Sequence, residues 1–123
     1  VFYDESKIAL MPMGFCYPGR GKGGDLPPRP ECAPLWHNAL LTCMPSLELI
    51  ILTGTYSQQY YLKKTAKATL TETVKSYNDF LPKYFPLPHP SPRNRFWQFK
   101  KPWFGNEVVP VLQESVARIL DLD

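Results

Sequence analysis

The sequence predicts an α/β domain built around a mostly parallel β-sheet. Aliphatic runs that are typical of strands alternate three times with segments whose apolar residues recur at the spacing of a helix. The chain also holds 14 prolines among its 123 residues, which favours short elements joined by fixed turns over long helices. Because helical crossovers join parallel strands, we expect the three strands to share one sheet.

The first half of the chain is expected to hold one strand, one loop and one helix. Residues 8–15 form a short apolar run that ends near Gly14, as a strand would. Residues 16–31 are rich in Gly and Pro and lack the spacing of a phosphate-binding loop, so we expect a flexible, solvated loop. A helix is predicted from Cys32, with Pro34 in its first turn. The face expected to be buried consists of Leu35, Trp36, Ala39, Leu40 and Cys43.

Two further strands are predicted in the second half. Residues 47–54 form a nearly continuous aliphatic run, which is typical of a strand buried on both faces, and a short helix is expected over residues 56–62. Residues 83–90 are expected to form the last strand. These two strands would complete a strand–helix alternation that begins at residue 8.

Two more helices are predicted by their capping residues. Thr69 or Thr71 can cap a helix that continues to about Phe80, with Glu72 placed for a capping interaction. The final helix is expected to begin at Asn106 as its cap. Its apolar face consists of Val108, Val109, Leu112, Val116, Ile119 and Leu120.

The composition excludes several classes of protein. Hydrophobic residues make up 44% of the chain and charged residues 20%, close to the globular average, so the chain as a whole is expected to fold. The net charge of +3 is too small to indicate a polyanionic partner by itself. No apolar run approaches the length of a membrane span and no signal peptide opens the chain, so we expect a cytoplasmic protein without a membrane partner.

Each expected strand ends in an unusual loop. The first ends in MGFC, the second in TGTY and the third in PHPSPRN, which contains His89. Ligands bind beyond the carboxyl ends of the strands in an open parallel sheet, so we expect these loops to meet at one edge. The sequence therefore predicts a substrate pocket there. Its residues would be Met13, Gly14, Phe15 and Gly54.

Three segments together resemble a known family. Residues 89–94, HPSPRN, resemble the second signature motif of the uracil-DNA glycosylase superfamily, and their Arg-Asn ending resembles its single-strand-selective branch. Residues 49–62, LIILTGTYSQQYYL, are similar to the strand–Gly–helix segment that precedes this motif. Residues 16–32, CYPGRGKGGDLPPRPEC, resemble the cysteine loop of the iron-sulfur branch. The resemblance covers nearly the whole chain, with the segments in the family's order.

The resemblance implies a function in DNA base-excision repair. A member of this family hydrolyses the N-glycosidic bond of uracil, or of a related deaminated base, in single- or double-stranded DNA. The motif histidine, His89 here, would donate to the uracil oxygen on which negative charge develops. The loop holding Ser91 would grip a flanking phosphate, and Arg93 or its neighbours would fill the space left by the flipped base. The other expected DNA contacts are Asn94, Arg95, Lys100 and Lys101, interleaved with aromatic residues of which one or two would touch DNA.

The three cysteines, an odd number, cannot all pair in internal disulfides. The resemblance implies that Cys16 and Cys32, which are 16 residues apart, ligate an iron-sulfur cluster. A [4Fe–4S] cluster takes four thiolates, so it is expected only if a missing N-terminal segment supplies two further cysteines. Zinc held by the three cysteines and His37 is an alternative whose spacing matches no standard pattern; otherwise His37 and Cys43 are expected to be structural.

The chain also departs from the family pattern. Nothing in it matches the Gly-rich first motif that positions the attacking water, or the aromatic residue that stacks on uracil. Met11 and Met13 stand where a strand usually supplies an Asn that reads the uracil edge. We therefore expect residues 1–123 to be the C-terminal two-thirds of one glycosylase-like domain, a three-layer α/β/α fold that lacks its first strand. Such a chain would be inactive alone and a monomer when complete.

Two other functions are open at this stage. A nucleic-acid-binding relative that has lost catalysis would bind DNA in a salt-dependent way without releasing a base. An interaction module would instead pair an exposed edge of its sheet with a second chain. Release of a base from uracil-containing DNA separates the glycosylase from both alternatives.

Overall fold

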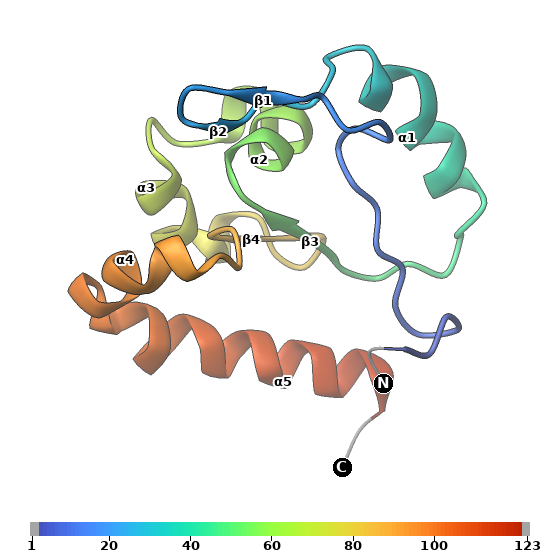
Figure 1. Ribbon diagram of the computed structural model, residues 1–123. Coiled ribbons are helices and arrows are strands. Elements are labelled where there is room, and N and C mark those ends of the chain that lie inside the picture. The colour runs from blue at the N-terminus through green and yellow to red at the C-terminus, as the bar shows by residue number, and fades with distance from the viewer. Residues whose placement is uncertain (1–2, 122–123) are drawn as a thin grey trace. The chain divides into compact units, whose positions relative to one another are not determined.

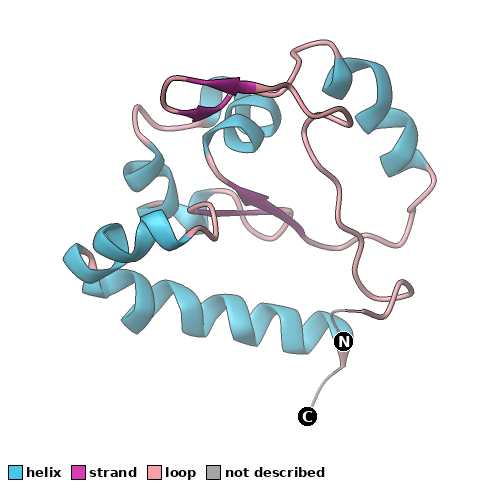
Figure 2. Ribbon diagram, in the orientation of Figure 1, coloured by secondary structure: helices cyan, strands magenta, loops and turns pink. Residues whose placement is uncertain are grey.

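The computed structural model describes residues 3–121. The contacts within the chain divide it into two compact units, Val1–Leu47 and Glu48–Asp123, each with its own internal packing. Figure 1 follows the elements along the chain, and Figure 2 separates its helices from its strands. No helix in the described residues is both long and apolar enough to cross a membrane.

The first unit contains a short hairpin. β1 (Arg20–Gly21) pairs antiparallel with β2 (Gly24–Asp25). Residues 22–23 form the two-residue turn between them, a turn length that favours glycine, and Gly24 takes a φ of 121°. The loop expected over residues 16–31 therefore holds a paired hairpin. Its glycines permit a tight turn, so the expectation of a flexible loop is wrong for residues 20–25.

Residues 8–15 form no strand, so the first expected strand is wrong. Pro12 has no amide hydrogen to offer to a neighbouring strand. Its carbonyl oxygen lies 2.8 Å from Nε2 of His37 instead. Because a carbonyl oxygen only accepts, His37 donates this bond through Nε2. The segment is thus held by a helix side chain where a strand would need a ladder of backbone bonds.

The helix of the first unit is α1 (Cys32–Thr42), which lies where the sequence predicts a helix. Its buried residues are Ala33 and His37, which are four positions apart and so share one face. A different face was predicted to be buried. Every residue of that predicted set is exposed: Leu35, Trp36, Ala39, Leu40 and Cys43. The prediction is wrong because the hydrogen bond of His37 turns a polar residue inward, which apolar periodicity cannot indicate.

The second unit is centred on two parallel strands. β3 (Ile50–Thr53) pairs with β4 (Tyr84–Leu87), with Leu52 in register with Pro86. This pairing confirms the α/β class with a parallel sheet, which has two strands among the residues that the structure describes. Both strands are shorter than the predicted runs, since only the residues that pair with the other strand count as strand.

Burial is divided between the two strands in an unexpected way. Ile51 in β3 is 42% exposed, so the prediction that this strand is buried on both faces is wrong. The neighbouring residues Phe85 and Pro86 of β4 are both buried, so β4 is the strand covered on its two faces. An aliphatic run therefore does not show by itself which strand lies deeper.

Helices lie on both sides of this strand pair (Figure 1). α2 (Thr55–Leu62) follows β3 directly, as predicted, and a short 3₁₀ turn (Lys63–Thr65) ends it. α5 (Val109–Leu120) lies on the other side. The buried core of the unit consists of Val74, Tyr77, Phe85, Phe104 and Val108. The rings of Tyr77 and Phe85 stack in it with centroids 5.3 Å apart.

α3 (Leu70–Lys75) is shorter than predicted, because a separate 3₁₀ turn (Tyr77–Asp79) follows it. Its cap is Thr69, whose Oγ1 accepts a hydrogen bond from the amide of Glu72 at 3.2 Å. This bond decides between the two threonines that the sequence offered as caps.

Two features near the C-terminus differ from the prediction. α4 (Arg95–Lys100), which follows a 3₁₀ turn (Pro92–Asn94), was not predicted as a helix. A wide π turn (Phe104–Val108) leads into α5, and Asn106 lies inside this turn. The prediction of Asn106 as the cap of the final helix is therefore wrong. The chain is already helical before α5 begins, and Phe104 and Val108, at the two ends of the π turn, are buried.

Candidate active site

The loops after β3 and β4 meet at the carboxyl end of the parallel strands. Gly54 follows β3 directly, and His89 comes shortly after β4. A Cβ placed on Gly54 would lie 3.7 Å from Cβ of His89 and 3.8 Å from its Cδ2. The His89 side chain therefore lies beside Gly54, at ordinary van der Waals distance from the position that a Cβ there would take. This edge is the place where open parallel sheets bind ligands.

Gln58 of α2 fastens the ends of the two strands. Its side chain is 3% exposed, and Nε2 donates to the carbonyl oxygen of Leu87 at 2.8 Å and to that of Leu52 at 3.2 Å. The amide of Gly54 also donates to Leu87, at 2.9 Å. Sequence reasoning missed Gln58, although a polar residue one turn into the helix after the strand–Gly segment was a signal for it.

Hydrogen bonds within the HPSPRN loop hold its backbone. The carbonyl oxygen of His89 accepts from the amide of Ser91 at 2.8 Å and from the side-chain Nδ2 of Asn94. The hydroxyl oxygen of Ser91 accepts from the amide of Arg93 at 3.3 Å. A hydroxyl that accepts one bond can still donate another, so the Ser91 hydroxyl keeps its hydrogen for a further bond. A phosphate as its partner stays a prediction.

The polar residues of this region differ in exposure. Four of them are exposed: His89, Arg93, Arg95 and Lys100. The other three are half-buried: Ser91, Asn94 and Lys101. Within residues 3–121, no ion pair involves Arg93, Arg95 or Lys100. These cations are therefore available to an external anion. Lys101 is engaged within the fold, since its Nζ lies 5.3 Å from the ring centroid of Trp97.

The aromatic residues after the loop separate into two groups. Trp97 and Trp103 pack against the core, and Nε1 of Trp97 donates to Oγ1 of Thr71 at 2.9 Å. Phe96 and Phe99, three positions apart on α4, are 77% and 85% exposed. Large exposed aromatics beside unpaired cations are typical of a surface that stacks on nucleobases.

Most of the chain matches a known protein family. Residues 2–113 match the Uracil DNA glycosylase superfamily. The chain belongs to the uracil DNA glycosylase superfamily. At the level of the family, its members are hydrolytic glycosylases that act on DNA. The parallel strand pair and the His89 loop beyond its end fit the α/β fold of this superfamily.

The other residues predicted for the glycosylase pocket lie in the first unit. Met13, Gly14 and Phe15 precede the hairpin there, whereas Gly54 belongs to the second unit. A Cβ on Gly14 would lie 3.2 Å from Cβ of Pro28, and the Phe15 ring meets the His37 ring edge-on at 5.8 Å. These contacts show packing inside the first unit. A role of these three residues in a uracil pocket stays a prediction.

The cysteines of this superfamily member do not by themselves form a cluster site. Cys16 is exposed, Cys32 is half-buried at the start of α1, and both thiols are free. No group of three or more His, Cys, Asp or Glu in residues 3–121 could hold a metal ion, so the zinc site with His37 and Cys43 is wrong. Two thiolates do not fit a four-iron cluster. A cluster completed by two further cysteines stays a prediction.

Proposed function

We propose that this chain carries the active-site loop of a DNA-repair glycosylase that hydrolyses the N-glycosidic bond of uracil, or of a related deaminated base. The observation that carries the proposal is the placement of His89 beside Gly54, beyond the carboxyl ends of two parallel strands. Superfamily membership supports the reaction class. The exposed His89 loop supports access to a base that has been turned out of the DNA stack.

His89 is proposed to act on the leaving base. Breaking the bond leaves an oxocarbenium-like sugar, and the base departs with the bonding electrons. A hydrogen bond from the imidazole to the base oxygen stabilises the charge that develops there. Water then adds its oxygen to the sugar and releases a proton. The bonds that Ser91 and Asn94 donate to the His89 carbonyl reduce the reorganisation that the loop needs during this step.

DNA binding is proposed to use the residues around α4. Arg93, Arg95 and Lys100 would neutralise phosphates, because each is exposed and none has an ion-pair partner within residues 3–121. Phe96 and Phe99 would stack on unpaired bases. Lys101 is the weakest member of the predicted set, since its charge already lies over Trp97.

The test compares two variants of the full-length protein in single-turnover assays on uracil-containing DNA. His89→Ala should slow base release by about 10²- to 10³-fold with little change in DNA affinity, because it removes a donor that acts on transition-state charge. Arg93→Ala should weaken binding and lower the salt slope by roughly one phosphate. Lys22→Ala, in the hairpin turn, is the matched control for loss of an exposed charge.

Each outcome assigns a function. If His89→Ala releases uracil at the normal rate once bound, the proposed role of the loop is wrong. If the unaltered protein binds DNA with a steep salt dependence and releases no base, the chain is a nucleic-acid-binding relative without catalysis.

A second candidate function rests on the small sheet. Within residues 3–121 the parallel sheet has two strands, so each of them has one edge without a strand partner. Ile51 of β3 adds an apolar side chain that is 42% exposed on one face. A protein with this function would self-associate in a concentration-dependent way, or would bind an added peptide that forms a further strand. Ile51→Lys should abolish that association, and a monomer at all concentrations would exclude the self-pairing form.

A further inference from the structure

A pocket lies at the opposite end of the strands from the His89 loop. Its volume is about 680 Å³, within the range of small-molecule sites. Tyr84, the first residue of β4, lines the pocket, whereas His89 follows the last residue of that strand. The four residues of β4 span roughly 10 Å, so the pocket and the loop are separate features of the second unit.

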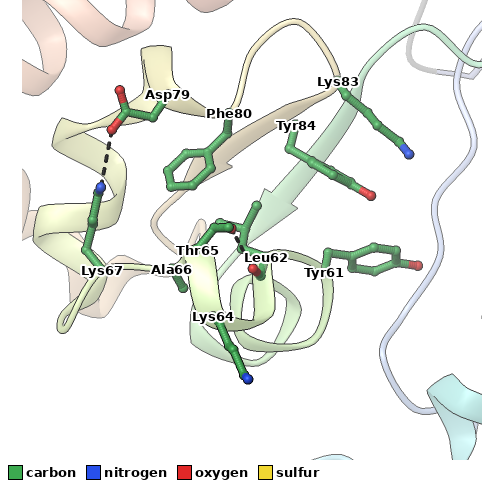
Figure 3. Close-up of a pocket in the computed structure, with 10 residues that line it drawn as sticks. All are labelled: Tyr61, Leu62, Lys64, Thr65, Ala66, Lys67, Asp79, Phe80, Lys83 and Tyr84. Atoms are coloured by element: carbon green, nitrogen blue, oxygen red, sulfur yellow. Dashed lines mark hydrogen bonds and ion pairs between the residues drawn. The ribbon is translucent and has the colours of Figure 1, made fainter.

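Part of the pocket wall is aromatic (Figure 3). The rings of Tyr61 and Tyr84 lie with centroids 5.9 Å apart and planes tilted by 47°, and Phe80 also lines the pocket. Burial, together with the neighbouring Tyr60 and Tyr84, raises the pKa of Tyr61 to about 12. The Tyr61 hydroxyl therefore keeps its proton at neutral pH and does not repel an anion. Such rings offer stacking surfaces to a nucleobase.

The charged residues of the wall favour an anionic ligand. Lys67 and Asp79 form an ion pair at 3.3 Å and so offset each other. Lys64 and Lys83 also line the pocket, and neither has an ion-pair partner within residues 3–121. The wall therefore presents two positive charges without a carboxylate partner, and that of Lys83 lies over the ring of Tyr84. Ammonium groups of this kind bind phosphate oxygens.

A cation and two hydroxyls are presented together at one side of the pocket. Nζ of Lys83 lies 5.2 Å from the ring centroid of Tyr84. In Figure 3, the amine of Lys83 and the hydroxyls of Tyr61 and Tyr84 extend toward the same side. A plain anion would use the lysines without the rings, and an apolar ligand would leave two charges unpaired. A ligand with a flat ring and a phosphate uses both.

We propose that this pocket binds a nucleoside phosphate, with the base on Tyr61 and Tyr84 and the phosphate on Lys83, whose amine extends to the same side as the two hydroxyls; Lys64 adds positive charge elsewhere on the wall. The site is independent of the chemistry assigned to His89. The same ligand chemistry has two sources, a free nucleotide or one nucleotide of a nucleic-acid strand. A strand bound here would give the protein a second contact with nucleic acid, at the opposite edge of the sheet from the glycosylase loop.

The test is a nuclear magnetic resonance titration of the full chain with four probes: dTMP, thymidine, inorganic phosphate and a twelve-residue oligo-dT without uracil. We expect saturable amide shifts at Tyr61, Lys64 and Tyr84 with dTMP and with oligo-dT. Thymidine and phosphate should each bind more weakly, because each offers half of the recognised chemistry. A tighter complex with oligo-dT than with dTMP identifies a strand as the source, and equal affinities identify a free nucleotide.

Charge reversal supplies the matched control. Lys64→Glu/Lys83→Glu should remove the dTMP shifts and lower the salt slope of oligo-dT binding by about 1 to 2. Lys7→Glu/Lys22→Glu changes the net charge equally at exposed positions of the first unit and should leave the dTMP shifts in place. The proposal is overturned if dTMP produces no saturable shifts, if its shifts fall only on residues of the His89 loop, or if both double variants lose binding equally.

Discussion

The side chain of His89 lies beside Gly54, the residue at which β3 turns into α2, with its Cβ 3.7 Å from the position that a Cβ on Gly54 would take. Gly54 has a φ of 90° and a ψ of 172°, a conformation that is almost confined to glycine. The sharp turn and the contact surface for His89 therefore depend on the same residue. The geometry of the candidate active site follows from a backbone requirement at the end of a strand.

Gly54→Ala should lower the free energy of unfolding by about 1–3 kcal/mol, because a residue with a Cβ is strained in this conformation. Relief of that strain would move the contact with His89, so base release should also slow. Gly105→Ala is the matched control: no atom lies within 4 Å of the added Cβ, and the change should stay within about 0.5 kcal/mol. Urea unfolding measures both. Equal losses would contradict the role given to Gly54.

Gln58→Leu should cost about 1–3 kcal/mol of stability, because it removes two donors from buried carbonyl groups at the strand ends. The exposed neighbour Gln59 provides the control, since Gln59→Leu changes the same chemistry without these bonds. Denaturant unfolding of the two variants gives the difference. A Gln58→Leu protein as stable as Gln59→Leu would show that the clamp contributes nothing.

Asn94→Ala should slow base release about tenfold, since one hydrogen bond of about 0.5–1.5 kcal/mol no longer holds the His89 carbonyl. DNA affinity should stay nearly unchanged, which distinguishes positioning of His89 from direct contact with DNA. Single-turnover rates and equilibrium binding are measured together, with the exposed Asn78→Ala as control. Weaker binding at an unchanged rate would assign Asn94 to the DNA contact instead.

The stability of the protein should fall between pH 10 and pH 12 through Tyr61. Its pKa is raised by burial from 10.0 to about 12, so in this window the unfolded chain releases the phenol proton while the folded chain retains it. Unfolding is then favoured as the pH rises. Urea unfolding at about pH 8, 10 and 11, values that bracket the ordinary tyrosine pKa, measures the loss of stability. Tyr61→Phe should flatten the profile, and an equally steep profile in that variant would refute the assignment.

Local patterns were sufficient for the elements whose residues interact with near neighbours. The run of residues 47–54 predicted β3, Thr69 with Glu72 predicted the start of α3, and the strand–Gly–helix order predicted α2. Each depends on contacts over a few positions, such as a capping bond or a helical repeat. The resemblance of HPSPRN likewise indicated the superfamily, which the match over residues 2–113 confirms.

Other predictions failed where a distant partner decides the structure. The buried face of α1 is chosen by the bond from His37 to Pro12, 25 positions away, and that bond also replaces the strand expected over residues 8–15. The depth of β3 depends on which helices cover it, so aliphatic composition alone overestimated the burial of Ile51. Such choices rest on packing energies that no short window of sequence contains.

The sequence by itself determined the α/β class, the parallel strand pair and the superfamily. Each of these is indicated by hydrophobic periodicity or by a motif that spans only a few residues. Only the tertiary structure decided that His89 lies against Gly54, that Gln58 joins the two strand ends, and which aromatics stay exposed. The first two of these relations join residues about 30 positions apart in the chain. They exist only once the strands pair, because pairing sets which loops and side chains meet at each end of the sheet.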